Sequence, residues 1–175
     1  MRAALFETQR LGAFALTADD QALYVALYTD PERLRFLLEA LTQAQAARSF
    51  SGALAAASDP SNGTQWLVLK HAGASIGLCG ITEWSAASQI AEVGILLLKS
   101  AQHQGFGVEG LRGTADWAFS ALPANRVEVR YLRVNAAAHA MVERVGFLRD
   151  DLARIKDTCV AYFDRRRSGA TVFSH

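Results

Sequence analysis

The residues from Ser100 to Gly110 read SAQHQGFGVEG, and the glycines among them fit two patterns that bind phosphate. Counted from Gln102, the stretch fits QxxGxG, in which small residues let a loop of backbone N–H groups approach a pyrophosphate at the start of a helix. Counted from Gly105, it fits GxGxxG, the pattern of a dinucleotide-binding turn. Either pattern indicates a ligand that carries phosphate, and the neighbouring elements decide between them.

Length and composition describe an ordinary globular chain. It has 175 residues, of which 51% are hydrophobic and 20% charged, so we expect one domain over residues 1–175. The formal net charge of +1 argues against a nucleic-acid binder that works by neutralising many phosphates. We therefore expect small molecules or proteins as partners.

The sequence has no segment typical of a signal peptide or a membrane span. The N-terminus, MRAALFETQRL, lacks a long apolar region, and no stretch approaches the roughly 18 consecutive apolar residues of a span. We expect a cytoplasmic protein. Cys79 and Cys159 lie far apart within apolar runs, with no CxxC and no histidine at ligand spacing. We interpret both as small buried hydrophobic residues and predict neither a disulfide nor a metal site.

The first half of the chain predicts a strand, a helical region and three more strands. RLGAFAL alternates over residues 10–16, and the TADD after it is a helix N-cap signal before a segment of one or two helices. Residues 41–64 predict a helix followed by an exposed loop at SDPSNG. WLVLKHAGASIGLCGITEW and QIAEVGILLLKS predict a three-stranded antiparallel meander whose first hairpin turns at HAGAS.

The second half predicts helices and strands in alternation. Residues 107–122 have an apolar face and stop before Pro123, which indicates a helix. RVEVRYLRV alternates as a strand, and NAAAHAMVERVGF predicts a short helix from Asn135 to Gly146. ARIKDTCVAYFDR predicts a final strand before an arginine-rich tail. This order places SAQHQGFGVEG between a strand that ends near Leu98 and the helix that follows.

The order of elements favours QxxGxG. A dinucleotide-binding turn follows its strand directly, and an acidic residue about 20 positions later binds the ribose. Here several residues separate Leu98 from Gly105, and the next strand has Glu128 in its middle. Only one further helix and strand follow. A dinucleotide-dependent enzyme remains an alternative that rests on GxGxxG alone.

Several blocks, in order, resemble the GNAT superfamily of N-acetyltransferases and, within it, the ribosomal-protein alanine acetyltransferase branch (RimJ/RimL type). They are ETQRL at 7–11, LTADD at 16–20, SIGLCGI at 75–81, AEVGILLL at 91–98, QHQGFGVEGL with Glu109, and VRYLRVNAAAHAMVERVGFLRD at 129–150. The resemblance covers most of the chain. It implies an α+β fold with a central, mostly antiparallel, twisted sheet of six to seven strands and helices on both faces.

The resemblance also implies a sheet that splays between the strand ending near Leu98 and the strand ending near Val134. Acetyl-CoA, as the co-substrate, would lie in the splay, with its pyrophosphate on the loop and its pantetheine paired with exposed strand backbone. No metal is implied. The residues expected to bind acetyl-CoA are Ile95, Leu96, Leu97, Gln102, His103, Gln104, Gly105, Phe106, Gly107 and Asn135.

Acetyl transfer to an amine requires a neutral amine, donors for the developing oxyanion and a proton for the departing thiolate. The resemblance favours Glu92 as the base, on one strand face with Gly94 and Leu96 by period-two alternation. A cross-strand or solvent-facing glutamate is the alternative. Glu83 is the second candidate, either as base or as a ligand for the substrate's positive charge. The N–H groups of residues 95–97 are the expected oxyanion donors.

The expected proton donors for the thiolate are missing. Many superfamily members have a tyrosine seven positions after the asparagine that matches Asn135, where this chain has Val142. The RimJ/RimL branch often has a serine three positions after it, where this chain has Ala138. Asn135 could bind the pantetheine or an ordered water, and it could also cap the following helix. A thiol pKa of ~8.5 lets the thiolate leave without an acid. The groups that could substitute are Tyr131, His139, His103 and water.

We therefore expect an acetyl-CoA-dependent N-acetyltransferase that acts by direct attack in a ternary complex. The acceptor would be a primary amine, either a protein N-terminus or a small molecule, selected by residues 21–60 and by loops near the last strands. The missing donors leave an alternative, a catalytically weak or inactive acyl-CoA-binding or regulatory module of the same fold. Related proteins are often dimers, so a homodimer is a possible partner arrangement for this chain.

Overall fold

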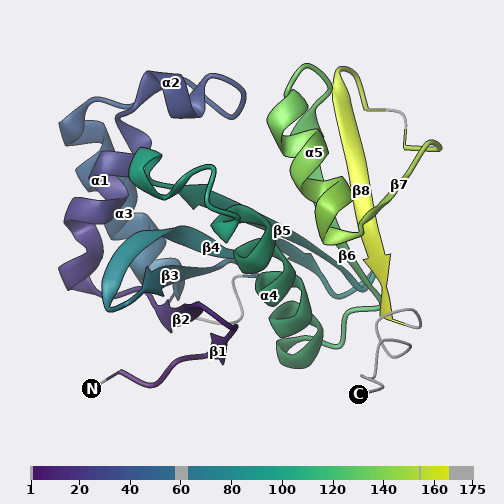
Figure 1. Ribbon diagram of the computed structural model, residues 1–175, viewed down its shortest axis with the longest axis horizontal. Coiled ribbons are helices and arrows are strands. Elements are labelled where there is room, and N and C mark those ends of the chain that lie inside the picture. Colours follow the sequence, from purple (N-terminus) through teal and green to yellow (C-terminus); the bar gives the residue numbers. More distant parts are fainter. Residues whose placement is uncertain (1, 58–62, 154, 166–175) are drawn as a thin grey trace.

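The computed structural model describes residues 2–57, 63–153 and 155–165, and the N-terminal elements follow the expected order (Figure 1). The first strands are β1 (Phe6–Glu7) and β2 (Leu11–Ala15). A 3-10 turn (Ala18–Asp20) follows, in which the Asp20 carboxylate accepts the Thr17 N–H at 2.9 Å, as expected of a helix-start signal. The helices after it are α1 (Gln21–Tyr28), α2 (Pro31–Leu34) and α3 (Gln43–Ala57). Residues 58–62 of the predicted SDPSNG loop lie outside the described residues.

The predicted meander is confirmed. Its strands are β3 (Gln65–His71), β4 (Ala74–Ser85) and β5 (Ile90–Leu97), each antiparallel to the next. The first hairpin turns at Ala72 and Gly73, whose φ angles of 47° and 82° are the positive values that a tight two-residue turn requires. The turn therefore lies within HAGAS, as predicted.

The C-terminal elements match the predictions in type and differ at their ends. They are α4 (Phe106–Ala121), β6 (Arg126–Leu132), α5 (Ala136–Val145), β7 (Leu148–Arg149) and β8 (Thr158–Asp164). Asn135 and Gly146 (φ 96°) are the N-cap and C-cap of α5. β6 ends two residues before its predicted end, and β8 begins five residues after its predicted start. Of the arginine-rich tail, the structure describes Arg165.

Within the described residues the strands form one eight-stranded sheet in the order β1-β2-β3-β4-β5-β6-β8-β7. The β5–β6 pair is parallel and the other neighbours are antiparallel. The number exceeds the predicted six to seven because β1 and β7 have two residues each, too few to show an alternating pattern. A mostly antiparallel sheet also contradicts the dinucleotide-binding alternative, which requires a doubly wound parallel sheet.

Helices cover both faces of the sheet, as predicted (Figure 1). On β3, Leu67 and Leu69 pack into the cluster that includes Leu111 of α4, while Val68 packs into the cluster that includes Leu27 of α1. Period-two alternation thus divides the core into an α4/α5 side and an α1/α3 side. In the described part of the chain, no helix combines the length and apolarity needed to cross a membrane.

The β5–β6 ladder is short and opens toward the loop before α4. The pairs are Ile90 with Arg126, Ala91 with Val127 and Glu92 with Glu128. Beyond Glu92, β5 continues beside β4, and β6 continues beside β8. This is the expected splay. Figure 1 shows α5, β6 and β8 on one side of it and α1 to α3 on the other.

Candidate functional site

The stretch with two glycine patterns forms a loop that ends as the N-terminus of α4. After β5, a 3-10 turn (Lys99–Ala101) leads to Gln102, and the backbone takes positive φ angles at His103 (60°) and Gly105 (81°). Gly105 is the N-cap of α4, and its left-handed conformation is one that glycine adopts without steric cost. We call residues 99–107 the cofactor loop.

The first turn of α4 offers N–H groups to a ligand. The Glu109 N–H donates to the Gly105 carbonyl at 3.1 Å, so the N–H groups of residues 106–108 precede the first helical bond. Such groups, with the positive end of the helix dipole, bind anions. A Cβ on Gly107 would lie 3.1 Å from Sδ of Met141, which shows how closely the loop approaches α5. The geometry fits a pyrophosphate.

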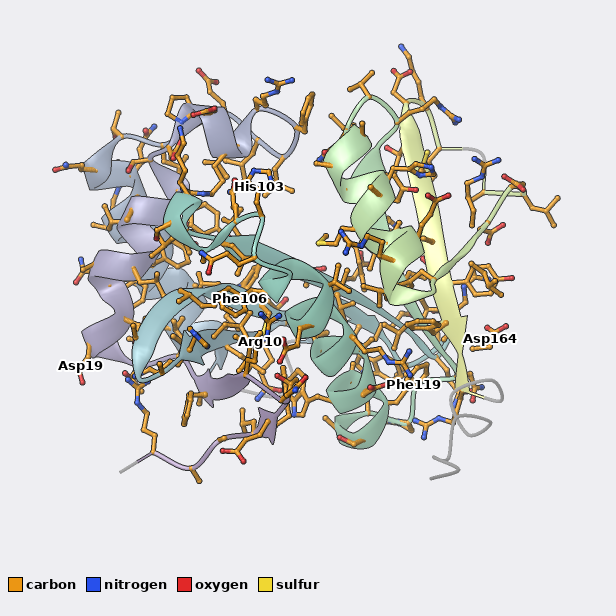
Figure 2. All side chains as sticks on the ribbon, in the orientation of Figure 1. Arg10, Asp19, His103, Phe106, Phe119 and Asp164 are labelled. Carbon is orange, nitrogen blue, oxygen red and sulfur yellow. The ribbon has the colours of Figure 1, made fainter. Side chains whose placement is uncertain are left out.

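The side chains of the cofactor loop mainly support its own shape. Gln102 Nε2 donates to the Leu97 carbonyl at 3.4 Å, and Gln104 Nε2 donates to the Ser100 carbonyl at 2.6 Å. Phe106 is buried in the core, so only its backbone N–H can face a cofactor. His103 is exposed at the apex of the loop (Figure 2).

The open edge of β5 presents two of the three backbone positions predicted to face the cofactor. The Leu98 N–H donates to the carbonyl of Ile76 on β4 at 2.9 Å. Because alternate residues of an antiparallel strand face the same neighbour, the N–H of Leu96 also points to β4. Alternation directs the N–H groups of Ile95 and Leu97 toward the splay. The backbone of Leu96 belongs to the β4–β5 ladder and its side chain packs on the α1/α3 side, so its contact with the cofactor stays a prediction.

Three carboxylates form a row across the sheet where the splay begins. Glu83 of β4 pairs with Glu92 of β5, which pairs with Glu128 of β6. Directly paired residues share a face of the sheet, so the three side chains point to the same side. Because Glu92 with Glu128 is the last pair of its ladder, the row marks the point from which the β5 edge is open.

Arg130, which sequence reasoning did not select as a site residue, joins this row. Its Nη1 lies 3.1 Å from Glu92 Oε2 and 3.7 Å from Glu83 Oε2, and its Nη2 lies 3.4 Å from Glu128 Oε2. Arg126 contacts Glu128 from the other side, with Nε 2.8 Å from Oε1. Two arginines thus offset part of the negative charge of the row. Within the described residues, no cluster of histidine, cysteine, aspartate and glutamate is arranged to hold a metal ion.

The surroundings of Glu92 favour its neutral form more than those of an ordinary glutamate. Burial raises the pKa of Glu92 above its usual range, Arg130 acts to lower it, and the charges of Glu83 and Glu128 raise it further. Its side chain is 22% exposed, against 66% for Glu83. A partly buried carboxylate with a raised pKa suits proton transfer. The ion pair with Arg130 of β6 also matches the alternative interpretation of Glu92 as a glutamate in a cross-strand pair.

Asn135 caps α5. Its Oδ1 accepts the N–H of Ala138 at 3.1 Å, so the alternative structural interpretation is confirmed. No atom of the described residues accepts a hydrogen bond from its amide nitrogen. The cap therefore leaves the two amide N–H donors of Asn135 free for a ligand, and the predicted contact with the cofactor stays a prediction.

The two roles of Asn135 can be separated by substitution. We expect Asn135→Ala to lower the free energy of unfolding by about 1 kcal/mol, because the cap is lost. Asn135→Ser keeps a capping oxygen and should retain stability near that of the wild type. Denaturant unfolding and the Michaelis constant for acetyl-CoA would be measured in parallel. A raised Michaelis constant in the serine variant would show that the Asn135 amide binds the cofactor. An unchanged constant would show that Asn135 acts only as the helix cap.

The positions of the missing proton donors are apolar. Val142 is buried in the core, and Ala138 packs against the same cluster. Two of the suggested substitutes bind each other, since the Tyr131 hydroxyl lies 2.9 Å from His139 Nδ1, and His139 Nε2 lies 3.3 Å from Glu143. The structure thus brings Tyr131 and His139 together, and each already has a hydrogen-bond or ion-pair partner within the protein.

A groove lies across the opening of the splay (Figure 1). It encloses about 380 Å³ between the segment after α2 and the end of β6, and we call it the acceptor groove. Three apolar side chains are exposed in these segments, Leu37 (63%), Leu38 (41%) and Val134 (71%). Sequence reasoning missed the groove because RLRFLLEAL continues a helical pattern, whereas α2 ends at Leu34. The residues that line it are Pro31, Arg35, Phe36, Leu37, Leu38, Glu39, Ala40 and Leu132.

Comparisons with known proteins agree with this architecture. Residues 10–148 match the family described as the acetyltransferase (GNAT) domain. The chain is 22% identical over 149 residues to the uncharacterized N-acetyltransferase p20 of Bacillus licheniformis, which covers 84% of each protein.

Two solved structures show the same fold with a bound coenzyme. A spermidine N-acetyltransferase from Vibrio cholerae, in complex with coenzyme A and spermine, has a TM-score of 0.77 at 18% identity over 91% of this chain and 98% of that one. RimL, a ribosomal-protein α-N-acetyltransferase in complex with coenzyme A, has a TM-score of 0.77 at 14% identity over 93% and 98%. Because the family match spans most of the chain, and the splayed sheet and cofactor loop agree with it, this protein is an N-acetyltransferase of the GNAT family, of the RimJ/RimL type.

Proposed function

We propose that the chain transfers the acetyl group of acetyl-CoA to a primary amine by direct attack in a ternary complex. The observation that supports this most is the end of the β5–β6 ladder at Glu92 and Glu128. It leaves the β5 backbone open between a carboxylate at one end and the cofactor loop at the other. Acetyl-CoA, when bound, supplies an activated acyl carbon, and the chain supplies positioning, charge stabilisation and a proton acceptor.

Glu92 is the proposed general base. An amine is mostly protonated at neutral pH and must lose a proton before it can attack. The carboxylate of Glu92 lies at the start of the splay and can accept this proton directly or through one water. Arg130, 3.1 Å away, holds the carboxylate in place and acts to lower its pKa against the effect of burial.

The backbone of β5 is the proposed oxyanion site. The N–H groups of Ile95 and Leu97 point into the splay, and such fixed donors stabilise negative charge on the acyl oxygen without reorganising. The thiolate is proposed to leave without an acid from the protein, since Val142 and Ala138 offer no proton and a thiol of pKa ~8.5 is a fair leaving group. Protonation from water would follow.

The acceptor groove is the proposed route of the amine. Leu132 lines the groove and is two residues after Arg130 on β6, so alternation places both on the face of the carboxylate row. Apolar side chains at the groove favour an amine that carries an apolar group, whether a protein N-terminus or a small molecule. Released thiol would be measured with acetyl-CoA and pairs of amines matched in charge, with and without an apolar substituent.

Ligand-dependent stability provides a first test. We expect acetyl-CoA at about 100 times its Kd to stabilise the fold by ~2.7 kcal/mol. For a chain of this size the melting temperature should rise by roughly 5 to 10 °C. NAD, the ligand of the rejected dinucleotide-binding interpretation, should leave it unchanged. Thermal unfolding followed by circular dichroism would measure both, and stabilisation by NAD alone would contradict the proposal.

Turnover separates the enzyme from the acyl-CoA-binding module that the missing donors suggest. An enzyme releases thiol in proportion to the amine supplied. A non-catalytic module binds acetyl-CoA and releases none across a broad panel of amines and N-terminal peptides. The second outcome would keep the proposed cofactor site and reject the proposed reaction.

A further inference from the structure

The turn between β1 and β2 reaches α4 and holds the carboxylate of Glu109. Thr8 Oγ1 donates to Glu109 Oε1 at 2.6 Å, and the backbone N–H of Arg10 donates to the same oxygen at 2.7 Å. Arg10 Nε donates to Oε2 at 2.7 Å. One turn of the N-terminal hairpin therefore holds both carboxylate oxygens of a residue in the first turn of α4. We call Thr8, Arg10 and Glu109 the loop clamp.

Arg10 also contacts the cofactor loop itself. Its Nη1 donates to the Gln104 carbonyl at 3.0 Å, and its guanidinium carbon lies 4.6 Å from the centroid of the Phe106 ring (Figure 2). A Cβ on Gly105 would lie only 3.2 Å from its Nη2. These contacts extend from Gln104 to Glu109. Arg10 thus holds the segment that carries the free N–H groups of the loop.

The clamp is attached to the sheet on its other side. The Arg10 carbonyl lies 3.0 Å from Nδ1 of His71 on β3, and the His71 ring lies 4.6 Å from the Phe106 ring. The Leu11 N–H donates to the Thr8 hydroxyl at 3.0 Å and closes the turn. Because the sheet holds Arg10 and Arg10 holds the loop, the position of the loop is fixed relative to β5.

Charge links the clamp to a phosphate ligand. Residues 100–108 contain no lysine or arginine, and Lys99 is paired with Glu32 at 2.9 Å. Burial acts to raise the pKa of Glu109, but hydrogen bonds from Thr8 and Arg10 outweigh it and lower this pKa below its usual range. The carboxylate is therefore an anion at the helix end that binds anions. Without Arg10, this charge would face a pyrophosphate uncompensated.

We propose that the loop clamp sets the affinity for the pyrophosphate of acetyl-CoA, with Arg10 as the positioning residue that orients the cofactor loop and neutralises Glu109. This rests on the proposed function, because it assigns the loop to acetyl-CoA. The proposal also gives a physical role to ETQRL at residues 7–11, far in sequence from the cofactor loop. Its Thr8 and Arg10 are the two side chains that the hairpin contributes to the clamp.

The test compares two acyl donors. Acetyl-CoA has the pyrophosphate and S-acetylpantetheine lacks it, while both present the same thioester. We expect Arg10→Gln to raise the Michaelis constant for acetyl-CoA about tenfold, as for loss of one charge-assisted hydrogen bond, with kcat nearly unchanged. The kinetics with S-acetylpantetheine should stay within about twofold of the wild type. A variant that loses both activities equally would show that Arg10 only supports the fold, and the proposal would fall.

Further variants keep the outcome interpretable if Arg10→Gln unfolds. Arg10→Lys retains the charge without the fork geometry and should give a smaller rise in the Michaelis constant. Adding Glu109→Gln to Arg10→Gln removes the uncompensated charge and should restore part of the affinity. Arg112→Gln, which breaks an exposed ion pair with Asp116 on the same helix, is the matched control. It should leave the kinetics with both acyl donors unchanged.

Binding to the wild type distinguishes this inference from the proposed function. Calorimetric titration of the wild type with acetyl-CoA that shows no binding overturns the proposed function. If the wild type binds acetyl-CoA and the Michaelis constant for acetyl-CoA is unchanged in both Arg10→Gln and Arg10→Lys, the proposed role of the loop clamp is overturned and the proposed function is not.

Discussion

Replacing Glu92 with glutamine is expected to lower kcat about 100- to 1,000-fold near pH 7, which lies within the range typical for loss of a general base. Glutamine keeps the size of the side chain and one acceptor oxygen, but its amide cannot accept the proton of the amine. Steady-state thiol release with saturating acetyl-CoA would measure the loss. The Michaelis constant for acetyl-CoA should change little, because Glu92 lies at the opposite end of the open β5 edge from the cofactor loop.

The pH profile tests the mechanism more strictly than the rate at one pH. A base acts when unprotonated, so activity of the wild type should fall as the pH drops through the pKa of Glu92, which burial raises above the usual range for glutamate. The glutamine variant should lack this acidic limb. At pH values above the pKa of the acceptor amine, the amine is already neutral, and the difference between variant and wild type should narrow. A difference that stays constant up to high pH would contradict a role in proton transfer.

Stability provides an independent control for the same substitution. A glutamate whose pKa is raised by folding binds its proton more tightly in the folded state, so its contribution to stability falls as the pH rises from the ordinary pKa through the raised one. At neutral pH the glutamine variant should therefore be at least as stable as the wild type. Arg130 keeps two carboxylate partners, Glu83 and Glu128, in that variant.

Glu83→Gln is the matched comparison, because Glu83 is the second candidate base and contacts the same arginine. Its carboxylate is more exposed and lies farther from Arg130, at 3.7 Å against 3.1 Å for Glu92. We expect kcat within about threefold of the wild type, as for an exposed ion pair of small energy. A larger loss in Glu83→Gln than in Glu92→Gln would reverse the assignment of the base.

Elements with a strong local signal were predictable from the sequence. The meander follows from β-rich runs separated by turn residues, and α5 follows from Asn135 and Gly146, which cap it as predicted. The shape of the loop before α4 was predictable too, because its backbone geometry requires a glycine at position 105. Gly105 has φ 81° in the structure, a conformation that most other residues avoid.

The features that were missed depend on contacts between segments distant in sequence. Neither β1 nor β7 is long enough to show a period, and each exists because a neighbouring strand offers free backbone groups. Arg130 joins the site only because β4, β5 and β6 align three glutamates in one row. The acceptor groove arises because α2 stops at Leu34 although apolar residues continue, so that tertiary context overrides the helical period.

The coincidence of two glycine patterns also has a physical explanation. A Cβ on Gly110 would lie 2.8 Å from Cδ1 of Ile95 and 3.0 Å from Cδ1 of Leu69, both on the sheet beneath α4. This glycine, which completes GxGxxG, therefore permits close packing of the helix on the strands. A dinucleotide-binding turn needs its last glycine for the same reason. The two patterns overlap because both begin a helix that lies tightly against a sheet.

The second large effect is expected from Gly107→Val, which should weaken binding of coenzyme A about 100-fold, or ~2.7 kcal/mol. The added Cβ would lie 3.1 Å from Met141 Sδ and 3.8 Å from Leu97 Cδ1, so the side chain extends between α4, α5 and the open edge of β5. In the proposed function, the cofactor extends through this region from the loop to the splay. Isothermal titration with coenzyme A would measure the change.

The fold should tolerate this substitution, because the nearest obstacle is the flexible end of a methionine and valine has a higher helix propensity than glycine. Gly52→Val on α3 is the matched control, since a Cβ there meets nothing within 4 Å. It should bind coenzyme A like the wild type. If Gly107→Val binds equally well while its melting temperature without ligand is unchanged, the pyrophosphate does not lie on this loop. The SAQHQGFGVEG stretch would then owe its glycines to backbone conformation and packing, and the cofactor site would have to be sought elsewhere along the open edge of β5.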